Sequence, residues 1–159
     1  RIYGDERIHE FFREAADPSF ADYGAAIVAN AEALAEALAK QGFRLVSGGT
    51  DNHLLLVDLR PFDAELTGKV AQASLDAAGI TLNKNTVPDD PRSPFVTSGV
   101  RIGTPAVTTQ GMGTDEMPEI AELIAAVLSA PEDEAVQAEV AERTAALCAR
   151  FPVYPGLIG

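Results

Sequence analysis

The chain has 159 residues, 47% of them hydrophobic, and its 12 basic and 24 acidic residues give a net charge of −12. This apolar content suits one folded domain, and the acidic excess argues against nucleic acid, whose phosphates need clustered Lys and Arg. Because no apolar run of about 18 residues occurs and the N-terminus is too polar for a signal peptide, we expect no membrane span and a cytoplasmic location. The single cysteine, Cys148, excludes an internal disulfide and a cysteine-based zinc site, and no metal is expected.

The first strong structural signal is a long helix over residues 19–41. Alanine is dense there, which favours helix, and Gly42 is a plausible C-cap. Residues 1–14 before it are interpreted as an N-terminal junction. The apolar residues that share one face of the helix are Ile27, Ala31, Leu34 and Leu38.

Two strands are predicted next, at residues 43–46 and 53–59. The second is a continuous apolar run, which is typical of a strand covered on both faces. Residues 47–52 between them have the composition of a turn. A helix is then expected over residues 63–78, with Asp63 as its N-cap.

The rest of the chain alternates short strands, one long loop and helices. Strands are predicted at residues 79–82 and 100–103, separated by a loop at 83–94 that is rich in Pro, Asn and Asp. Loops of this length inside compact domains are often functional. Three helices should follow, starting at Thr104-Pro105, Thr114 and Pro131. The order predicts an α/β two-layer sandwich, a small and mostly antiparallel sheet covered by helices.

Arg101 is the only charged residue between Arg92 and Asp115. Its planar guanidinium can bind both oxygens of a carboxylate, and the flanking Gly99 and Gly103 allow a ligand to approach closely. The alternative is a structural arginine bound to a backbone carbonyl or to an internal carboxylate such as Asp58. The residues alone leave both interpretations open.

Other polar residues suit recognition better than catalysis. His53, at the start of the apolar strand, could stack on a ring or donate a proton, or could be a hydrogen-bonded edge residue. Asn83, Lys84 and Asn85 offer donors from a loop, although Lys84 has no surroundings that indicate a Schiff base. No nucleophile or metal motif is present, so the chain resembles half of a site.

Three segments closely resemble the serine hydroxymethyltransferase family: residues 45–59, 83–105 and 150–155. The resemblance covers about residues 15–155 but not residues 1–12. It implies an enzyme of fold type I that depends on pyridoxal 5′-phosphate. Such an enzyme interconverts serine plus tetrahydrofolate and glycine plus 5,10-methylenetetrahydrofolate.

The resemblance also implies roles for individual residues. Arg101 would bind the carboxylate of serine or glycine, and Asn85 with Ser93, Pro94 and Phe95 would contact the folate. We expect His53 to support this site. No catalytic residue is expected in this chain, because the lysine that binds the cofactor covalently belongs to the family's large domain. Gln110 stands where many relatives carry arginine, which could alter a nearby anion contact.

Residues 15–159 are therefore expected to form the small domain, including the helix at about 19–41 that links it to a large, cofactor-binding domain. The parent enzyme should be a homodimer or larger, and the isolated domain should not turn over. Two alternatives remain at this point. One is a non-catalytic folding or interaction module. The other is the small domain of a related pyridoxal-phosphate transaldolase or α-methylserine enzyme.

Overall fold

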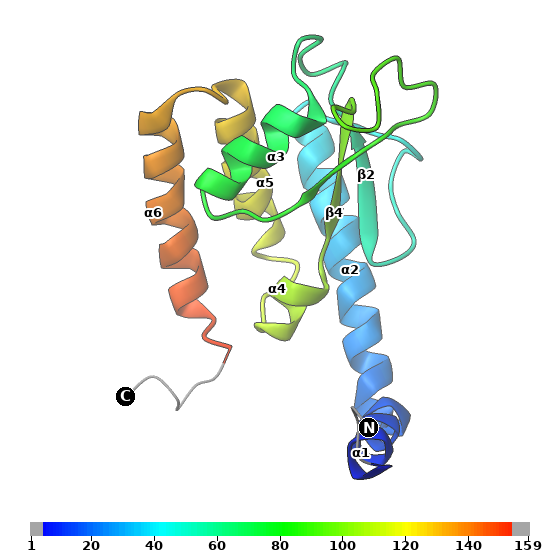
Figure 1. Ribbon diagram of the computed structural model, residues 1–159. Helices are drawn as coiled ribbons and strands as arrows, with labels where there is room; N and C mark the ends of the chain where they lie inside the picture. The colour runs from blue at the N-terminus through cyan, green and yellow to red at the C-terminus, as the bar shows by residue number, and fades with distance from the viewer. Residues whose placement is uncertain (1–4, 154–159) are drawn as a thin grey trace.

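The structure is a computed structural model that describes residues 5–153, which form helices around one sheet of four strands (Figure 1). The predicted α/β class is confirmed. The helices are α1 (Asp5–Ala16), α2 (Pro18–Lys40), α3 (Gly68–Ala77), α4 (Pro105–Thr109), α5 (Met117–Ser129) and α6 (Glu134–Arg150). The strands are β1 (Arg44–Leu45), β2 (Leu54–Asp58), β3 (Asn83–Asn85) and β4 (Gly99–Gly103).

The sheet has the order β1-β2-β4-β3, and every neighbouring pair is antiparallel. Strand β4 therefore lies between two partners and is hydrogen-bonded on both edges. Arg101 on β4 lies opposite Leu56 on β2 and opposite Asn83 on β3. Directly opposed residues in antiparallel strands point to the same side of a sheet, so these three side chains share one face.

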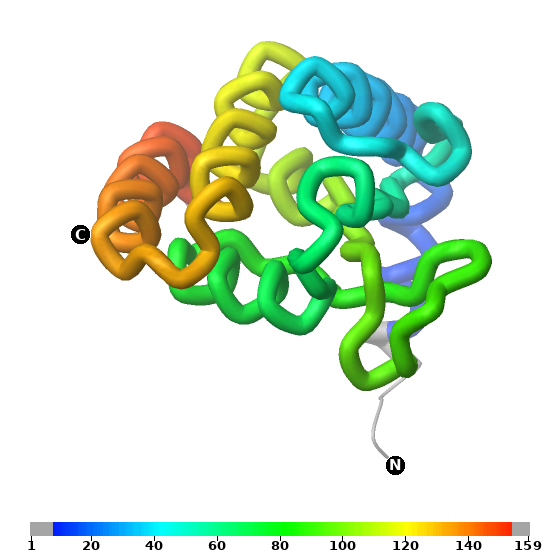
Figure 2. The backbone as a smooth tube through the Cα atoms, turned by 90° about the horizontal axis from the view of Figure 1, so that it is seen from above, coloured from blue at the N-terminus to red at the C-terminus, as the bar shows by residue number. Residues whose placement is uncertain are grey.

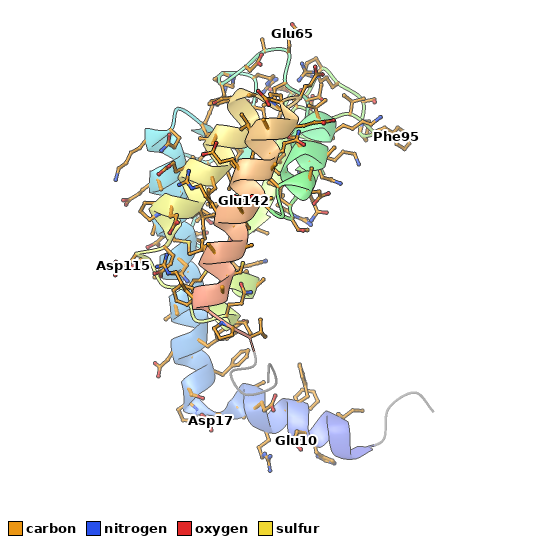
Figure 3. All side chains as sticks on the ribbon, turned by 90° about the vertical axis from the view of Figure 1, so that its left-hand side faces the viewer. Glu10, Asp17, Glu65, Phe95, Asp115 and Glu142 are labelled. Atoms are coloured by element: carbon orange, nitrogen blue, oxygen red, sulfur yellow. The ribbon has the colours of Figure 1, made fainter. Side chains whose placement is uncertain are left out.

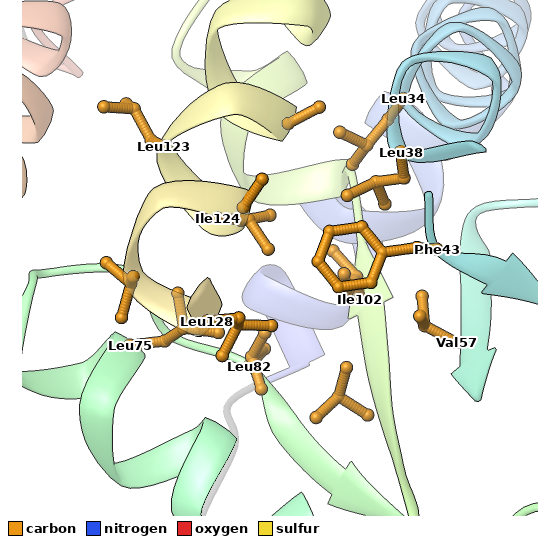
Figure 4. Close-up of a cluster of buried hydrophobic side chains, with 14 of the residues drawn as sticks. Leu34, Leu38, Phe43, Val57, Leu75, Leu82, Ile102, Leu123, Ile124 and Leu128 are labelled. Carbon is orange, nitrogen blue, oxygen red and sulfur yellow. The ribbon is translucent and has the colours of Figure 1, made fainter. Parts of the chain in front are cut away.

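The hydrophobic core lies on the other face of the sheet, where α2, α3 and α5 gather (Figure 2). Helix α6 packs outside them, against α5 and α3. Side chains from the strands meet those of the helices in one cluster (Figure 4). The strand residues in this cluster are Leu55, Val57, Val100 and Ile102, and among the helix residues are Leu34, Leu38, Ile124 and Leu128.

Helix α2 matches the prediction to within a residue at each end. Its N-cap is Asp17, whose carboxylate accepts a hydrogen bond of 2.9 Å from the backbone N–H of Ser19, and Pro18 occupies the first turn. Gly42 follows the helix at φ +92°, a backbone conformation that glycine adopts without strain. Leu34 and Leu38 are buried as expected.

The expected start of α3 was wrong. The helix begins at Gly68 rather than at residue 63, because its N-cap is Thr67, whose hydroxyl accepts a hydrogen bond of 3.1 Å from Val70 N–H. Asp63 instead accepts from Glu65 N–H at 2.9 Å and closes a local turn. The same kind of side-chain-to-backbone bond can cap a helix or a turn, which the sequence alone does not distinguish.

The predicted strand at residues 79–82 was also wrong, because the strand in this region is β3 at Asn83–Asn85. Gly79 at φ +76° ends α3, and Ile80 N–H bonds back to the carbonyl of Leu75. Leu82 is buried in the core without belonging to a strand. The polar β3 segment becomes a strand because β4 offers it a free edge, not because of its own pattern.

Two later helices start about three residues after the predicted positions. Helix α5 begins at Met117 rather than at Thr114, since Glu116 reaches back to accept Gly113 N–H at 2.8 Å. Helix α6 begins after Asp133, not at Pro131, because the Asp133 carboxylate accepts Ala135 N–H at 2.9 Å.

Helix α1 occupies residues for which the sequence predicted no structure, and it extends sideways from the start of α2 (Figure 3). Three of its large apolar side chains are exposed. None of the helices within residues 5–153 is long and apolar enough to cross a membrane. The exposed apolar residues of α1 are Ile8, Phe11 and Phe12.

Candidate functional site

The candidate site lies on the sheet face turned away from α2, α3 and α5, which we call the open face. It carries Leu54, Leu56, Asn83 and Arg101, because these residues alternate with the buried ones along their strands. Arg101 is exposed, and within residues 5–153 its guanidinium joins no hydrogen bond or ion pair. An arginine held on a central strand without a partner is available to a ligand.

Asp58, the carboxylate that could have satisfied Arg101, is bound by other arginines. Arg60 donates to its two oxygens at 2.9 and 2.7 Å, and Arg44 lies 3.6 Å away. The hydrogen bond from Arg60 lowers the pKa of Asp58, although burial opposes the shift. Asp58 is 1% exposed, so a ligand in solvent cannot reach its carboxylate. The pairing with Arg101 that the sequence left open does not occur.

The end of β4 is fixed by Thr104, which is completely buried. Its N–H donates to the carbonyl of His53 at 3.1 Å, and its hydroxyl donates to the carbonyl of Ile27 in α2 at 2.8 Å. Asn30 of α2 also donates to Thr108 of α4 at 2.9 Å. The helix that follows Arg101's strand is thus tied to α2. His53 itself is exposed, and its contact here is made by the backbone.

Asn85 lies on the same face as Arg101, two residues beyond Asn83 on β3. It is half-buried, and its side-chain amide donates to the carbonyl of Thr86 at 2.8 Å. Its amide oxygen accepts no hydrogen bond among residues 5–153. The structure therefore brings Asn85 and Arg101 to one face of adjacent strands.

The segment Ser93-Pro94-Phe95 lies in the loop between β3 and β4, residues 86–98. All three residues are exposed, and the Phe95 ring is 82% exposed and projects away from the body of the protein (Figure 3). The Ser93 carbonyl accepts N–H groups of Val96 at 3.0 Å and Thr97 at 2.9 Å, so the segment is a closed turn. The Phe95 ring is thus exposed to solvent on a turn that backbone hydrogen bonds close.

Sequence reasoning missed the residues that hold this loop. Arg60 donates to the carbonyls of Pro88 and Asp89 at 3.4 and 3.3 Å. The first N–H groups of α3, those of Gly68 and Lys69, donate to loop carbonyls at residues 96–97, each at 3.0 Å. No spacing in the sequence connects these partners, because each contact joins segments about 28 residues apart.

The described residues do not supply a covalent partner for pyridoxal phosphate beside Arg101. The chain has three lysines, of which Lys40 and Lys69 lie on α2 and α3, on the far side of the sheet. Lys84 lies opposite Val100, so it too points to the face opposite Arg101. Among residues 5–153 no group of three His, Cys, Asp or Glu side chains could hold a metal ion.

Gln110 ends α4 and is half-buried. It lines an apolar cavity of about 280 Å³ together with Leu123, Ile124 and Cys148, behind the sheet. Its expected influence on an anion contact stays a prediction.

The chain is thus an α/β domain whose small antiparallel sheet carries an exposed arginine beside a loop closed by hydrogen bonds. The family model for serine hydroxymethyltransferase matches residues 9–124, well over half of the chain. The chain therefore belongs to the serine hydroxymethyltransferase family. The matched range includes strands β2, β3 and β4, which carry the open face, and the whole of the loop.

Proposed function

We propose that this chain is the small domain of a serine hydroxymethyltransferase, which interconverts serine plus tetrahydrofolate and glycine plus 5,10-methylenetetrahydrofolate. The observation that carries the proposal is the position of Arg101 within the matched family range. It is exposed on the open face and has no partner within residues 5–153, whereas the nearby carboxylate Asp58 is bound by Arg60.

Arg101 binds the α-carboxylate of serine or glycine. Its fork geometry matches the two carboxylate oxygens, and the central strand that carries it is hydrogen-bonded on both edges. Because pairing on both edges restrains the β4 backbone, the origin of the Arg101 side chain is well defined. Fixing the carboxylate also fixes how the rest of the amino acid is oriented.

Asn85 and the Ser93-Pro94-Phe95 segment bind tetrahydrofolate. The Asn85 amide oxygen and the Ser93 hydroxyl can hydrogen-bond the polar edges of the folate ring system. The exposed Phe95 ring offers it a flat apolar surface. His53 supports the site from the residue before β2, where its carbonyl accepts a hydrogen bond from the N–H of Thr104.

Pyridoxal phosphate is held by a large domain outside this chain, because the lysines here face away from Arg101. When bound, the cofactor stabilises negative charge at the substrate's α-carbon. The contribution of this chain is to bind and orient the two substrates. The exposed Ile8, Phe11 and Phe12 on α1 support a second domain packed there, since apolar patches usually mark interfaces. The complete enzyme is expected to be cytoplasmic and a homodimer or larger.

The decisive test is Arg101→Ala in the full-length enzyme that carries this domain. Losing a charged, bidentate contact should weaken serine binding by about 2–5 kcal/mol, seen as a large rise in KM for serine. Arg101→Lys keeps the charge but loses the fork and should recover part of the effect. Arg143→Ala, which removes an arginine bound to Glu122 on the surface, is the control. An unchanged KM in Arg101→Ala removes this residue from substrate binding.

A second test uses the 159-residue chain alone. It should give no serine–glycine interconversion and no visible absorption band when pyridoxal phosphate is added. Turnover by the chain would contradict the assignment of the cofactor to another domain. Full activity of the complete enzyme without tetrahydrofolate would favour the transaldolase or α-methylserine alternative.

A further inference from the structure

Asp90 lies at the centre of the loop between β3 and β4, and its carboxylate accepts four hydrogen bonds. One oxygen accepts the Ser98 hydroxyl at 2.7 Å and the Arg92 N–H at 3.0 Å. The other accepts the Ser98 N–H at 2.9 Å and the Val87 N–H at 3.2 Å. A single side chain therefore joins the first residues of the loop to the last.

The donors of these bonds are themselves anchored. Ser98 is completely buried, and its hydroxyl also accepts a hydrogen bond of 3.2 Å from the Arg92 guanidinium. The same guanidinium donates to the carbonyls of Leu66 at 3.0 Å and Ala64 at 2.6 Å, just before α3. Asp90 and Arg92 together form a bracket that closes the loop and ties it to the segment preceding α3. We call these two residues and Ser98 the loop bracket.

The bracket holds a backbone path that the chain would not otherwise favour. Asp89 has φ +52° and Thr97 has φ +59°, the left-handed region that a β-branched residue such as Thr97 rarely adopts. These two residues stand next to Asp90 and Ser98. Strained conformations persist only where the surroundings over-determine them, so the bracket maintains the closed loop together with the contacts from Arg60 and from the start of α3.

None of the bracket residues belongs to the exposed segment itself. Ser93, Pro94 and Phe95 lie between Arg92 and Ser98, so the bracket grips the segment at both of its ends. Ser93 and Phe95 direct no side-chain hydrogen bond to the rest of residues 5–153. Their arrangement in space therefore depends on the bracket.

We infer that Asp90 is a positioning residue for folate binding: its carboxylate keeps the Ser93-Pro94-Phe95 turn in the binding conformation before the ligand arrives. This inference rests on the proposed function. Without the bracket the segment samples other conformations. The apparent affinity for tetrahydrofolate then falls in proportion to the population that remains in the binding conformation. Serine binding at Arg101, on the neighbouring strand, does not use the segment.

The test compares Asp90→Asn with Asp89→Asn in the full-length enzyme. Both remove one carboxylate charge, but the Asp89 side chain is exposed and accepts no hydrogen bond among the described residues, and Asn tolerates its positive φ. Asp90→Asn should raise KM for tetrahydrofolate about tenfold, the effect of one lost charge-assisted hydrogen bond, while KM for serine changes less than about twofold. Asp89→Asn should leave both constants unchanged.

Ser98→Ala provides a milder disruption if Asp90→Asn does not fold. It removes the hydrogen bond that the Ser98 hydroxyl donates to Asp90 and the one that it accepts from Arg92, but it keeps the Asp90 carboxylate and should raise KM for tetrahydrofolate about threefold. In the 159-residue chain, amide hydrogen exchange at Val87 and Ser98 should accelerate in Asp90→Asn but not in Asp89→Asn.

The outcomes separate this inference from the proposed function. If the wild-type enzyme needs tetrahydrofolate and Asp90→Asn behaves like Asp89→Asn, the positioning role is overturned and the function stands. If both KM values rise in parallel, Asp90 is merely structural and the inference is again overturned. A wild-type enzyme that neither binds nor uses tetrahydrofolate overturns both.

Discussion

The two faces of the sheet are built from the same strands but differ in how deeply their side chains are buried. Leu55 and Val57 on β2 are each 1% exposed on the helix-covered face, whereas Leu56 between them is half-buried on the open face. On β4, Val100 is buried and its neighbour Arg101 is exposed. Since side chains alternate along a strand, adjacent positions should give opposite phenotypes: loss of stability on one face, loss of ligand binding on the other.

The largest effect on stability is expected for Leu55→Ala. Truncating a leucine in a packed core leaves a cavity and costs about 3 kcal/mol in the free energy of unfolding. Leu56→Ala is the matched control, because it lies next in the chain but on the open face and should cost less than half as much. Urea unfolding measures both. Equal losses would mean that the two faces are not energetically distinct.

A smaller loss, about 2 kcal/mol, is expected for Gly99→Ala, where the loop covers one end of the open face. A Cβ atom there would lie 2.6 Å from the carbonyl oxygen of Val57, and both the backbone and Val87 of the loop crowd it. Gly103→Ala, at the other end of β4, meets its nearest atom at 3.5 Å and should be nearly neutral. Similar thermal midpoints for the two variants would contradict this packing difference.

The next effect concerns acid and the loop bracket. Burial alone would raise the pKa of Asp90, but hydrogen bonds from Ser98, Arg92 and Val87 outweigh it and lower the pKa from 3.8 to about 2. The unfolded chain therefore takes up this proton first as pH falls. The stabilising contribution is complete above about pH 4 and is lost as pH falls through about 2.

Asp90→Asn should accordingly cost about 1–2 kcal/mol near neutral pH and flatten the acid dependence of unfolding between pH 4 and 2. Denaturant midpoints measured across that range, with Asp89→Asn as reference, check the sign. A variant whose stability falls as steeply as the wild type's would show that Asp90 does not carry this dependence.

The smallest effect on stability is expected for Arg101→Ala. An exposed side chain without a partner among residues 5–153 should change the free energy of unfolding by no more than about 0.5 kcal/mol. Together with the large rise in KM for serine, this would place Arg101 on the binding side of the comparison. A loss above about 1 kcal/mol would indicate a structural role instead.

The apolar pattern predicted the covered half of the molecule well. Helix α2 and strands β2 and β4 follow from periodicity and from continuous apolar runs, because burial of their side chains dominates their energetics. The polar half was less predictable. Strand β3, Asn83–Asn85, forms because it pairs with β4. Asp63 and Thr67 can both accept a hydrogen bond from a backbone N–H, so the sequence does not tell which of them caps α3.

At the candidate site, too, some residues could be predicted from the sequence and others could not. Arg101 could be singled out because it is the one charge in a long uncharged stretch. The bracket could not, since the partners of Asp90 and Arg92 lie up to 28 residues away and in a loop full of similar polar residues. The bracket forms only when the loop closes in three dimensions, and the spacing of residues in the sequence does not predict that closure.

The β3–β4 loop consists of an exposed tip, Ser93-Pro94-Phe95, and a frame formed by the rest of residues 86–98, which matters for how such a domain can evolve or be redesigned. The frame is held largely through main-chain groups and through residues outside the tip. Ser93 and Phe95 can therefore be exchanged without rewriting the scaffold, in the way that antibody loops vary on a constant framework. A library confined to those two positions should retain folding in nearly every member, which thermal unfolding of the variants would show.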